Sequence, residues 1–195
     1  MDFKDRTRAY FQDVKAAMDR IPVEAVTRIY ECVVRAYDED RQVFIIGNGG
    51  SAANASHAAC DLGKGTHHPG RRRFRVVSLA DNTPVATAYA NDLSYDQIFA
   101  EPIRTLARDG DLVIALSGSG NSPNVLEGVK AAREVRARSV ALTGYGGGKL
   151  KDLADETLIV PSSNMQHIED CHLILCHLIY HGIRDHVAQE AAAGR

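Results

Sequence analysis

Short runs of apolar residues recur along the chain, separated by longer stretches with the spacing of helices. Each run is apolar throughout rather than alternating with polar residues, which is typical of strands covered on both faces of a sheet. The predicted strands span residues 43–46, 76–77, 112–116, 140–142 and 158–160. Repeated strand–helix–strand units favour right-handed crossovers and a parallel sheet. The predicted fold is therefore α/β, a three-layer α/β/α sandwich with a parallel sheet.

Helices are expected at both ends of the chain. Near the start, the apolar residues at helical spacing are Phe3, Phe11, Val14, Met18 and Ile21. A second helical pattern covers about residues 23–37, after a break at Pro22, so an N-terminal helical hairpin is predicted. A long helix over roughly residues 165–189 follows the last strand. We therefore predict a single domain over residues 1–195 with a helical extension of about residues 1–40.

The composition is that of a globular protein, since 45% of the 195 residues are hydrophobic and 25% are charged. The net charge of −2 excludes a broad positive surface that would draw the protein to nucleic acid or an anionic membrane. Charges fill most of residues 2–6, and no segment approaches the ~18 apolar residues of a membrane span. We expect a cytoplasmic protein with no nucleic-acid or membrane partner.

The strongest local motif is S-G-S-G-N-S-P at residues 117–123, directly after a buried strand and before a helical pattern. Ser122 suits the helix N-cap and Pro123 the first turn, so free backbone N–H groups and hydroxyls are expected to gather there. This arrangement predicts a phosphate site without a lysine, and it matches neither the Walker loop nor the dinucleotide fingerprint. The alternative is a capped turn with no ligand.

A second glycine turn, G-N-G-G-S at residues 47–51, follows the first strand. Glycine permits a close approach of the backbone to a ligand, and Ser51 is expected to cap the next helix. Ligands of parallel sheets lie beyond the carboxyl ends of the strands. The two loops are therefore interpreted as two walls of one pocket.

These motifs, with N-D at residues 91–92 and A-L-T-G at residues 141–144, resemble the SIS (sugar isomerase) domain. The resemblance covers nearly the whole chain and is strongest for the phosphoheptose isomerase group. That group interconverts sedoheptulose 7-phosphate and D-glycero-D-manno-heptose 7-phosphate, so the resemblance implies an isomerase of a sugar-phosphate substrate. It also implies a homo-oligomer, a homotetramer with pockets between subunits.

The resemblance implies which residues bind the sugar phosphate. Asp92 is placed among them as a polar residue at a strand end. The implied set is Asn48, Gly49, Ser51, Asp92, Ser117, Gly118, Ser119, Asn121 and Ser122. Gly118 stands where the family has a threonine, and Gly65 stands where it has an arginine, which leaves the identity of the sugar open.

The resemblance also implies the catalytic and metal-binding residues. A helix histidine and glutamate of the family correspond to His57 and Asp61, and a glutamine and histidine of its last helix correspond to Glu169 and His177. We expect Asp61 or Glu169 to be the base at the C–H bond and His177 to act on the oxygens. His57, Asp61, Glu169 and His177 would hold Zn²⁺, although eight residues of helix separate Glu169 from His177. A polar network without metal is the alternative.

The remaining reactive side chains are expected to be structural or exposed. The run Arg71-Arg72-Arg73 is interpreted as a solvated loop. The cysteines lack C-x-x-C spacing, which does not favour disulfides or a cysteine zinc site; they are Cys32, Cys60, Cys171 and Cys176. The histidines of the last helix treated in the same way are His167, His172, His181 and His186.

Two other functional classes stay open. A non-catalytic SIS adaptor, of the kind that associates with the DnaA replication initiator, has a similar glycine turn but lacks the helix carboxylate and the last-helix histidine. Because Asp61 and His177 are present here, chemistry is favoured over an adaptor. A sugar-phosphate sensor would keep the serine loop and need no base.

Overall fold

The computed structural model describes residues 2–193; Met1, Gly194 and Arg195, at the ends of the predicted domain, lie outside the described residues. Its centre is a sheet of five parallel strands in the order β2-β1-β3-β4-β5. The strands are β1 (Val43–Gly47), β2 (Val76–Ser78), β3 (Leu112–Ser117), β4 (Arg138–Thr143) and β5 (Glu156–Ile159). The predicted strands are confirmed, with ends that differ by one or two residues.

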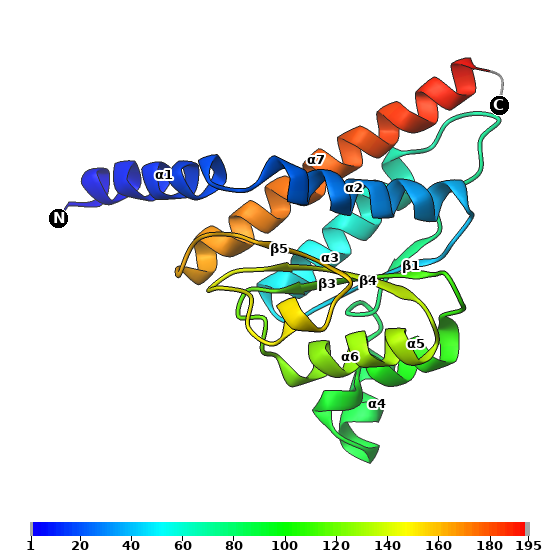
Figure 1. The fold of residues 1–195 in the computed structure, drawn as a ribbon. Helices are drawn as coiled ribbons and strands as arrows, with labels where there is room; N and C mark the ends of the chain where they lie inside the picture. Colours follow the sequence, from blue (N-terminus) through cyan, green and yellow to red (C-terminus); the bar gives the residue numbers. More distant parts are fainter. Residues whose placement is uncertain (1, 194–195) are drawn as a thin grey trace.

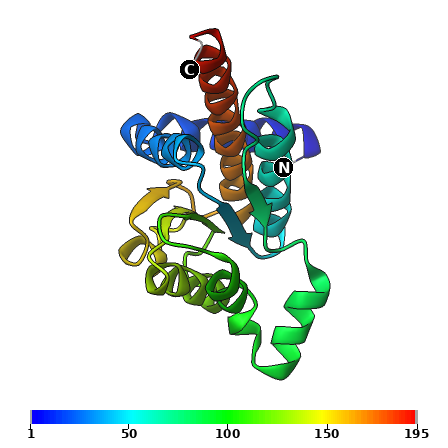
Figure 2. The same ribbon diagram turned by 90° about the vertical axis from the view of Figure 1, so that its right-hand side faces the viewer.

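Helices cover both faces of the sheet, which confirms the three-layer α/β/α sandwich (Figures 1 and 2). The α-helices are α1 (Phe3–Asp19), α2 (Val23–Asp38), α3 (Gly50–Cys60), α4 (Thr83–Asp92), α5 (Ala100–Leu106), α6 (Pro123–Glu134) and α7 (Met165–Ala192). Shorter turns are the π-helical η1 (Asp61–Gly65) and the 3-10 segments η2 (Tyr95–Gln97) and η3 (Leu150–Asp152). Among the described residues, no helix has both the length and the apolar composition that crossing a bilayer requires.

The two faces of the sheet carry separate hydrophobic cores. Successive side chains of a strand point to opposite faces, so Val43 and Ile45 of β1 pack with α2, α3 and α7, whereas Phe44 and Ile46 pack with α5 and α6. All five residues of β1 are buried. This two-sided burial explains why the strands are apolar throughout.

The N-terminal region is helical, as predicted, but the predicted hairpin is wrong, because each of its two helices packs against α7 instead of against the other. Figures 1 and 2 show α2 continuing away from α1 rather than folding back along it. Both helices pack against α7. Tyr10 attaches α1, because its hydroxyl donates to Asp170 at 2.5 Å and its ring packs edge-on against His167 at 4.5 Å between centroids.

Two helices project from the body of the protein. Only Ala17 is buried in α1, and α4 has no buried residue. Figure 1 shows α1 extending past one end of the sheet while α4 hangs below α5 and α6. Isolated helices shorter than about 12–15 residues are marginal in water. The ten residues of α4 therefore depend on contacts outside their own helix.

His172 of α7 is a fully buried structural residue, as predicted. Its Nε2–H donates to the carbonyl oxygen of Thr143 at the end of β4, 3.2 Å away, whereas its Nδ1 is buried and has no hydrogen-bond partner among residues 2–193. Burial lowers the pKa of His172 to about 4, so the ring is neutral near pH 7.

This neutral ring predicts a loss of stability in acid. Between pH 6.5 and about 4, unfolded His172 binds a proton and folded His172 does not, so unfolding becomes more favourable as the pH falls. The full effect is about 3 kcal/mol. The free energy of unfolding, measured with denaturant at several pH values, should fall less steeply with decreasing pH for His172→Gln than for the unmodified protein. His181→Gln, at an exposed position on the same helix, should show the same pH dependence as the unmodified protein. The same pH dependence of the unfolding free energy in all three proteins would contradict a lowered pKa of His172.

Candidate active site

Three loops meet at the carboxyl edge of the sheet. Gly47 at the end of β1 lies beside Leu116, and Ser117 at the end of β3 lies beside Thr143. The loops that leave these strands therefore start side by side, as the sequence predicted. The carboxyl edge is where ligands of open parallel sheets bind.

The serine loop has the donors of an anion site. The hydroxyl groups of Ser117 and Ser122 lie 3.4 Å apart. Ser122 is the N-cap residue of α6, as predicted, but its hydroxyl does not bond to the helix and is thus available to a ligand. Among the described residues, the backbone N–H groups of Ser119, Ser122 and Asn124 have no acceptor. Together with the positive end of α6, these groups suit a phosphate.

A glycine loop after β4 interlocks with the serine loop. Gly120 has a φ of +64°, and a Cβ there would lie 2.0 Å from the carbonyl oxygen of Gly147. The backbone N–H of Lys149 donates to Oδ1 of Asn121 at 3.1 Å, and Nδ2 of Asn121 donates to the carbonyl oxygen of Ser119 at 3.0 Å. The Asn121 side chain, predicted to bind the phosphate, is thus engaged in bracing the two loops.

Asn48 connects the glycine turn after β1 to the first turn of α6. Its Nδ2 donates to Oδ1 of Asn124 and its Oδ1 accepts from Nδ2 of Asn124, both at 2.8 Å. The hydroxyl of Tyr95 also donates to Oδ1 of Asn48, at 3.0 Å. The two predicted walls of the pocket are therefore joined by a direct pair of hydrogen bonds.

Two expectations about local position were wrong. The N-cap of α3 is Gly49, with a φ of +55°, and Ser51 is the second residue of the helix, buried against Gly47. With Gly49, at a left-handed φ, as the N-cap, the helix starts two residues earlier than it would with Ser51 as the N-cap. Asp92 does not follow a strand: it is the last residue of α4, exposed, and accepts from Nδ2 of Asn91.

His57, Asp61 and His177 form one cluster between α3 and α7. Oδ2 of Asp61 lies 3.4 Å from Nε2 of His57 and 3.7 Å from Nε2 of His177, and the two imidazole nitrogens are 3.3 Å apart. These side chains are between a quarter and a half exposed. Asp61, one methylene shorter than the family's glutamate, still reaches both rings. The cluster is both compact and open to a ligand.

The donor set of this cluster fits Zn²⁺. Zinc in proteins is tetrahedral, with Zn–N and Zn–O distances of about 2.0–2.2 Å, so its ligand atoms lie about 3.3–3.5 Å apart. The three separations in the cluster are 3.3, 3.4 and 3.7 Å. Nitrogen and carboxylate oxygen are ordinary zinc ligands. Three protein ligands also leave a position for a substrate oxygen or water.

Glu169, the fourth expected ligand, is not part of this cluster. Its carboxylate lies against Gly50 at the start of α3, where a Cβ on residue 50 would come within 2.3 Å of Oε2. Nδ2 of Asn54 donates to the backbone carbonyl of Glu169 at 3.0 Å and ties the two helices together there. About 12 Å of helix separates residue 169 from residue 177, which explains why the two side chains reach different parts of α3.

Three of the four cysteines have thiols whose pKa is raised by burial. Cys176, next to His177, is largely buried, and burial with a smaller contribution from the Asp61 charge raises the pKa of its thiol to about 12. Burial likewise raises the pKa of the Cys171 and Cys32 thiols. All four cysteines are free thiols.

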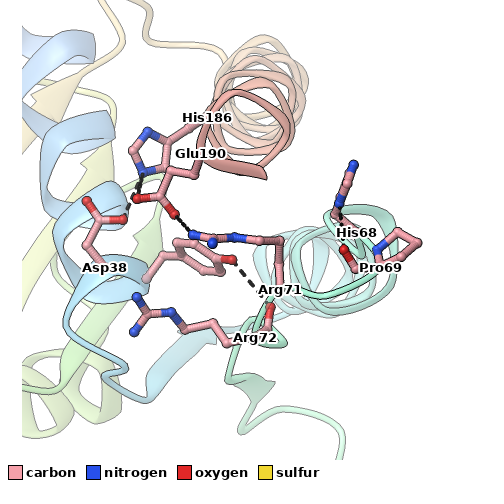
Figure 3. A network of polar contacts seen from close by, with 8 residues as sticks. Asp38, His68, Pro69, Arg71, Arg72, His186 and Glu190 are labelled. Carbon is pink, nitrogen blue, oxygen red and sulfur yellow. Dashed lines mark hydrogen bonds and ion pairs between the residues drawn. The ribbon is translucent and has the colours of Figure 1, made fainter. Parts of the chain in front are cut away.

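A second group of possible metal ligands lies at the far end of α7 (Figure 3). Nε2 of His186 is 2.8 Å from Oδ1 of Asp38 and 3.9 Å from Oε1 of Glu190. Arg71 pairs with the other oxygen of Glu190, and only 14% of the Arg71 side chain is exposed. Arg71 was expected in a solvated loop, but it neutralises Glu190 and ties the loop before β2 to α7. This group is a structural clasp between three segments.

The sequence reasoning missed three polar residues that hold the site together. Asn54, Tyr95 and Asn124 each make hydrogen bonds that join two site segments. The motif at residues 117–123 ended one residue before Asn124. An asparagine in the first turn of a helix that follows a ligand loop is the signal that could have indicated it.

Comparison with known proteins agrees with this geometry. A family model described as SIS domain matches residues 9–144. A probable phosphoheptose isomerase of Thermoplasma acidophilum is 37% identical over 172 residues, 88% of this chain and 94% of that protein. A phosphoheptose isomerase of Aquifex aeolicus is 34% identical over 92% of this chain and 93% of that protein.

Solved structures give the same result. The phosphoheptose isomerase of Neisseria gonorrhoeae superposes with a TM-score of 0.86 at 33% identity, covering 93% of this chain and 98% of that one. The chain belongs to the SIS domain family. Within that family it belongs to the phosphoheptose isomerase group, as its motifs predicted.

Proposed function

We propose that the protein is an aldose–ketose isomerase that interconverts sedoheptulose 7-phosphate and D-glycero-D-manno-heptose 7-phosphate through an enediol. The observation that carries the proposal is the contact of one carboxylate, Asp61, with the imidazoles of His57 and His177. The loop proposed to bind the phosphate follows β3 at the carboxyl edge of the sheet and offers free hydroxyl and N–H donors, which supports the proposal. The named activity of its relatives, phosphoheptose isomerase, supports the choice of substrate.

The reaction moves one carbon-bound proton and redistributes protons on two oxygens. From the ketose, Asp61 removes a proton from C1 while the carbonyl oxygen at C2 gains one, which gives the 1,2-enediol. The oxygen at C1 then loses its proton and C2 receives one, which leaves an aldehyde at C1 and a hydroxyl at C2. In the metal-free cluster His177 moves the protons on the two oxygens; its Nε2, which faces His57 and Asp61, cannot carry a proton while it binds Zn²⁺. Asp61 is preferred to Glu169 as the base because it contacts His177 directly.

The phosphate group is bound by uncharged donors. Ser117, Ser119 and Ser122 contribute hydroxyls or backbone N–H groups, and the positive end of α6 adds to the field. Binding energy from the phosphate, remote from C1 and C2, can position those carbons against Asp61. Asn48, Gly49, Ser51 and Asp92 remain predictions for contacts with the sugar.

We propose Zn²⁺ as the cofactor, held by His57, Asp61 and His177; Glu169, the fourth expected ligand, remains a prediction. When bound, the ion would stabilise negative charge that develops on the enediol oxygens. The histidine rings would be oriented by that ion together with their contacts to Asp61.

We also propose that the protein is a homotetramer. A groove of about 560 Å³ between α1 and α7 is lined mainly by apolar side chains and reaches His177. Phe3 and Phe11 of α1 are 81% and 68% exposed. A second copy that covers these faces would bury them beside the site. Free thiols throughout the chain support the cytoplasm as its location.

Asp61→Asn is expected to abolish isomerisation without loss of fold. Conversion of sedoheptulose 7-phosphate to the aldose should fall by about 10²–10⁴-fold in kcat, because the amide cannot accept the carbon-bound proton. The same assay with fructose 6-phosphate and arabinose 5-phosphate shows whether the unmodified protein acts on other sugar phosphates. Asp38→Asn, the same change in the distant clasp, should keep full kcat. A fully active Asp61→Asn protein would remove this residue from the mechanism.

Zinc binding should depend on the cluster between α3 and α7. In calorimetric titration with Zn²⁺, His57→Ala should lower the affinity by at least about tenfold, because one of three ligands is lost. His186→Ala in the clasp should leave the affinity of this site unchanged. Unchanged turnover after exhaustive chelation would exclude a required metal ion.

Light scattering should give a mass of about 85 kDa for a tetramer of the 21.2 kDa chain. Phe11→Asp places a charge on the exposed apolar face of α1 and is expected to lower that mass. Gln12→Asp, the adjacent exposed position, serves as the control and should not. A monomer mass for the unmodified protein would refute the assembly.

A further inference from the structure

Asn48, Tyr95 and Asn124 form a hydrogen-bonded cluster at the rim of the serine loop. They come from three segments: the turn after β1, the 3-10 segment η2 and the first turn of α6. Asn48 and Asn124 exchange two hydrogen bonds of 2.8 Å, and the Tyr95 hydroxyl adds a third of 3.0 Å. Tyr95 and Asn124, which lie 47 and 76 positions after Asn48 in the chain, therefore converge on the Asn48 amide.

The hydrogen bonds of Asn124 fix its orientation. Its side chain is 1% exposed, and its Oδ1 also accepts the backbone N–H of Val125 at 3.0 Å. A buried amide with its oxygen held by a helix N–H cannot rotate without losing bonds. Asn124 therefore presents a fixed donor and a fixed acceptor to Asn48.

These partners leave Asn48 one defined group for a ligand. Its Oδ1 accepts from both Asn124 and Tyr95, which uses both lone pairs. One N–H of its Nδ2 is bonded to Asn124, and the other has no acceptor among the described residues. Asn48 is partly exposed, so this remaining N–H can reach an oxygen of the substrate.

Asn124 also belongs to the anion site itself. It follows Ser122 by two residues, and its own backbone N–H is among the donors without an acceptor. The side chain thus fixes the distance between the glycine turn and the serine loop. A substrate that bridges the two loops requires both to be held at this spacing.

We propose that Asn124 and Tyr95 are positioning residues that hold the Asn48 amide so that its free N–H donates to an acceptor oxygen of the sugar phosphate. The inference rests on the proposed isomerase function. Neither residue touches the reacting carbons in this scheme, and both act through Asn48. Their loss should therefore change substrate affinity, while proton transfer by Asp61 continues once substrate is bound.

Steady-state kinetics on sedoheptulose 7-phosphate tests this role. Asn124→Ala and Asn48→Ala are each expected to raise KM about tenfold, the effect of one lost hydrogen bond of about 1.4 kcal/mol, with kcat changed by less than about twofold. The double variant should match Asn48→Ala alone, because the Asn124 side chain acts on the substrate only through Asn48 and its backbone N–H is kept in every variant. Increases in KM that multiply in the double variant would overturn the proposal, as would an unchanged KM for Asn124→Ala.

A substitution at the exposed Tyr95 tests the same role without the risk that the buried variant, Asn124→Ala, fails to fold. Tyr95 is 58% exposed, and Tyr95→Phe removes only the hydroxyl, so it should fold normally and raise KM about two- to fivefold. Tyr89→Phe on α4, whose hydroxyl makes no hydrogen bond among the described residues, should not change KM. Equal KM values for these two variants would overturn the role of Tyr95.

An unmodified protein that converts no sugar phosphate would refute the proposed function itself, whereas an active protein with unaffected variants refutes only this inference.

Discussion

The site depends on how closely α7 approaches the backbone of four other segments. At each approach the facing residue is a glycine, and a Cβ there would lie only 2.3–2.6 Å from an α7 side chain. The pairs are Gly50 with Glu169, Gly65 with Tyr180, Gly118 with Met165, and Gly144 with Ile168. A larger residue at any of these positions would have to displace the facing α7 side chain, so the glycines allow α7 to lie this close to α3 and to the loops. That position brings His177 to His57 and Asp61.

Charge is divided between the two halves of the site. The serine loop offers hydroxyls, backbone N–H groups and a helix end but no cationic side chain, whereas the cluster beside α7 contains a carboxylate and two imidazoles. In the proposed function, a dianionic ester would therefore bind where no carboxylate competes for the donors. Asp61 can then approach a neutral carbon rather than the phosphate. The protein as a whole has a net charge of −2, so the attraction for an anion must come from these local groups.

Predictions from the sequence succeeded where one segment determines the outcome. Strands buried on both faces must be apolar throughout, so their places could be read directly, and the loops at their carboxyl ends followed from the parallel topology. The i,i+4 spacing of His57 and Asp61 likewise placed both on one helix face.

Features that depend on contacts between distant segments could not be predicted. The direction of the Glu169 carboxylate is set by the space above Gly50, 119 positions earlier in the chain. The pairing of Asn48 with Asn124 spans 76 positions. Ser51 and Asp92 were misplaced for a local reason: a serine after glycines, or an N-D pair, does not reveal whether a helix has already begun.

The departures from the family motif share one physical pattern. Gly118 and Gly65 carry no side chain where the motif has threonine and arginine, and α7 fills the two spaces with Met165 and Tyr180. Asp61 is shorter than the family's glutamate, yet its carboxylate stays within 3.4 and 3.7 Å of the two imidazoles. Side chains on the strand and α3 side have become smaller, while those of α7 occupy the volume. Beside the two loops, α7 therefore supplies the side chains that face positions 65 and 118, so the sugar selectivity of this protein should depend on Met165 and Tyr180.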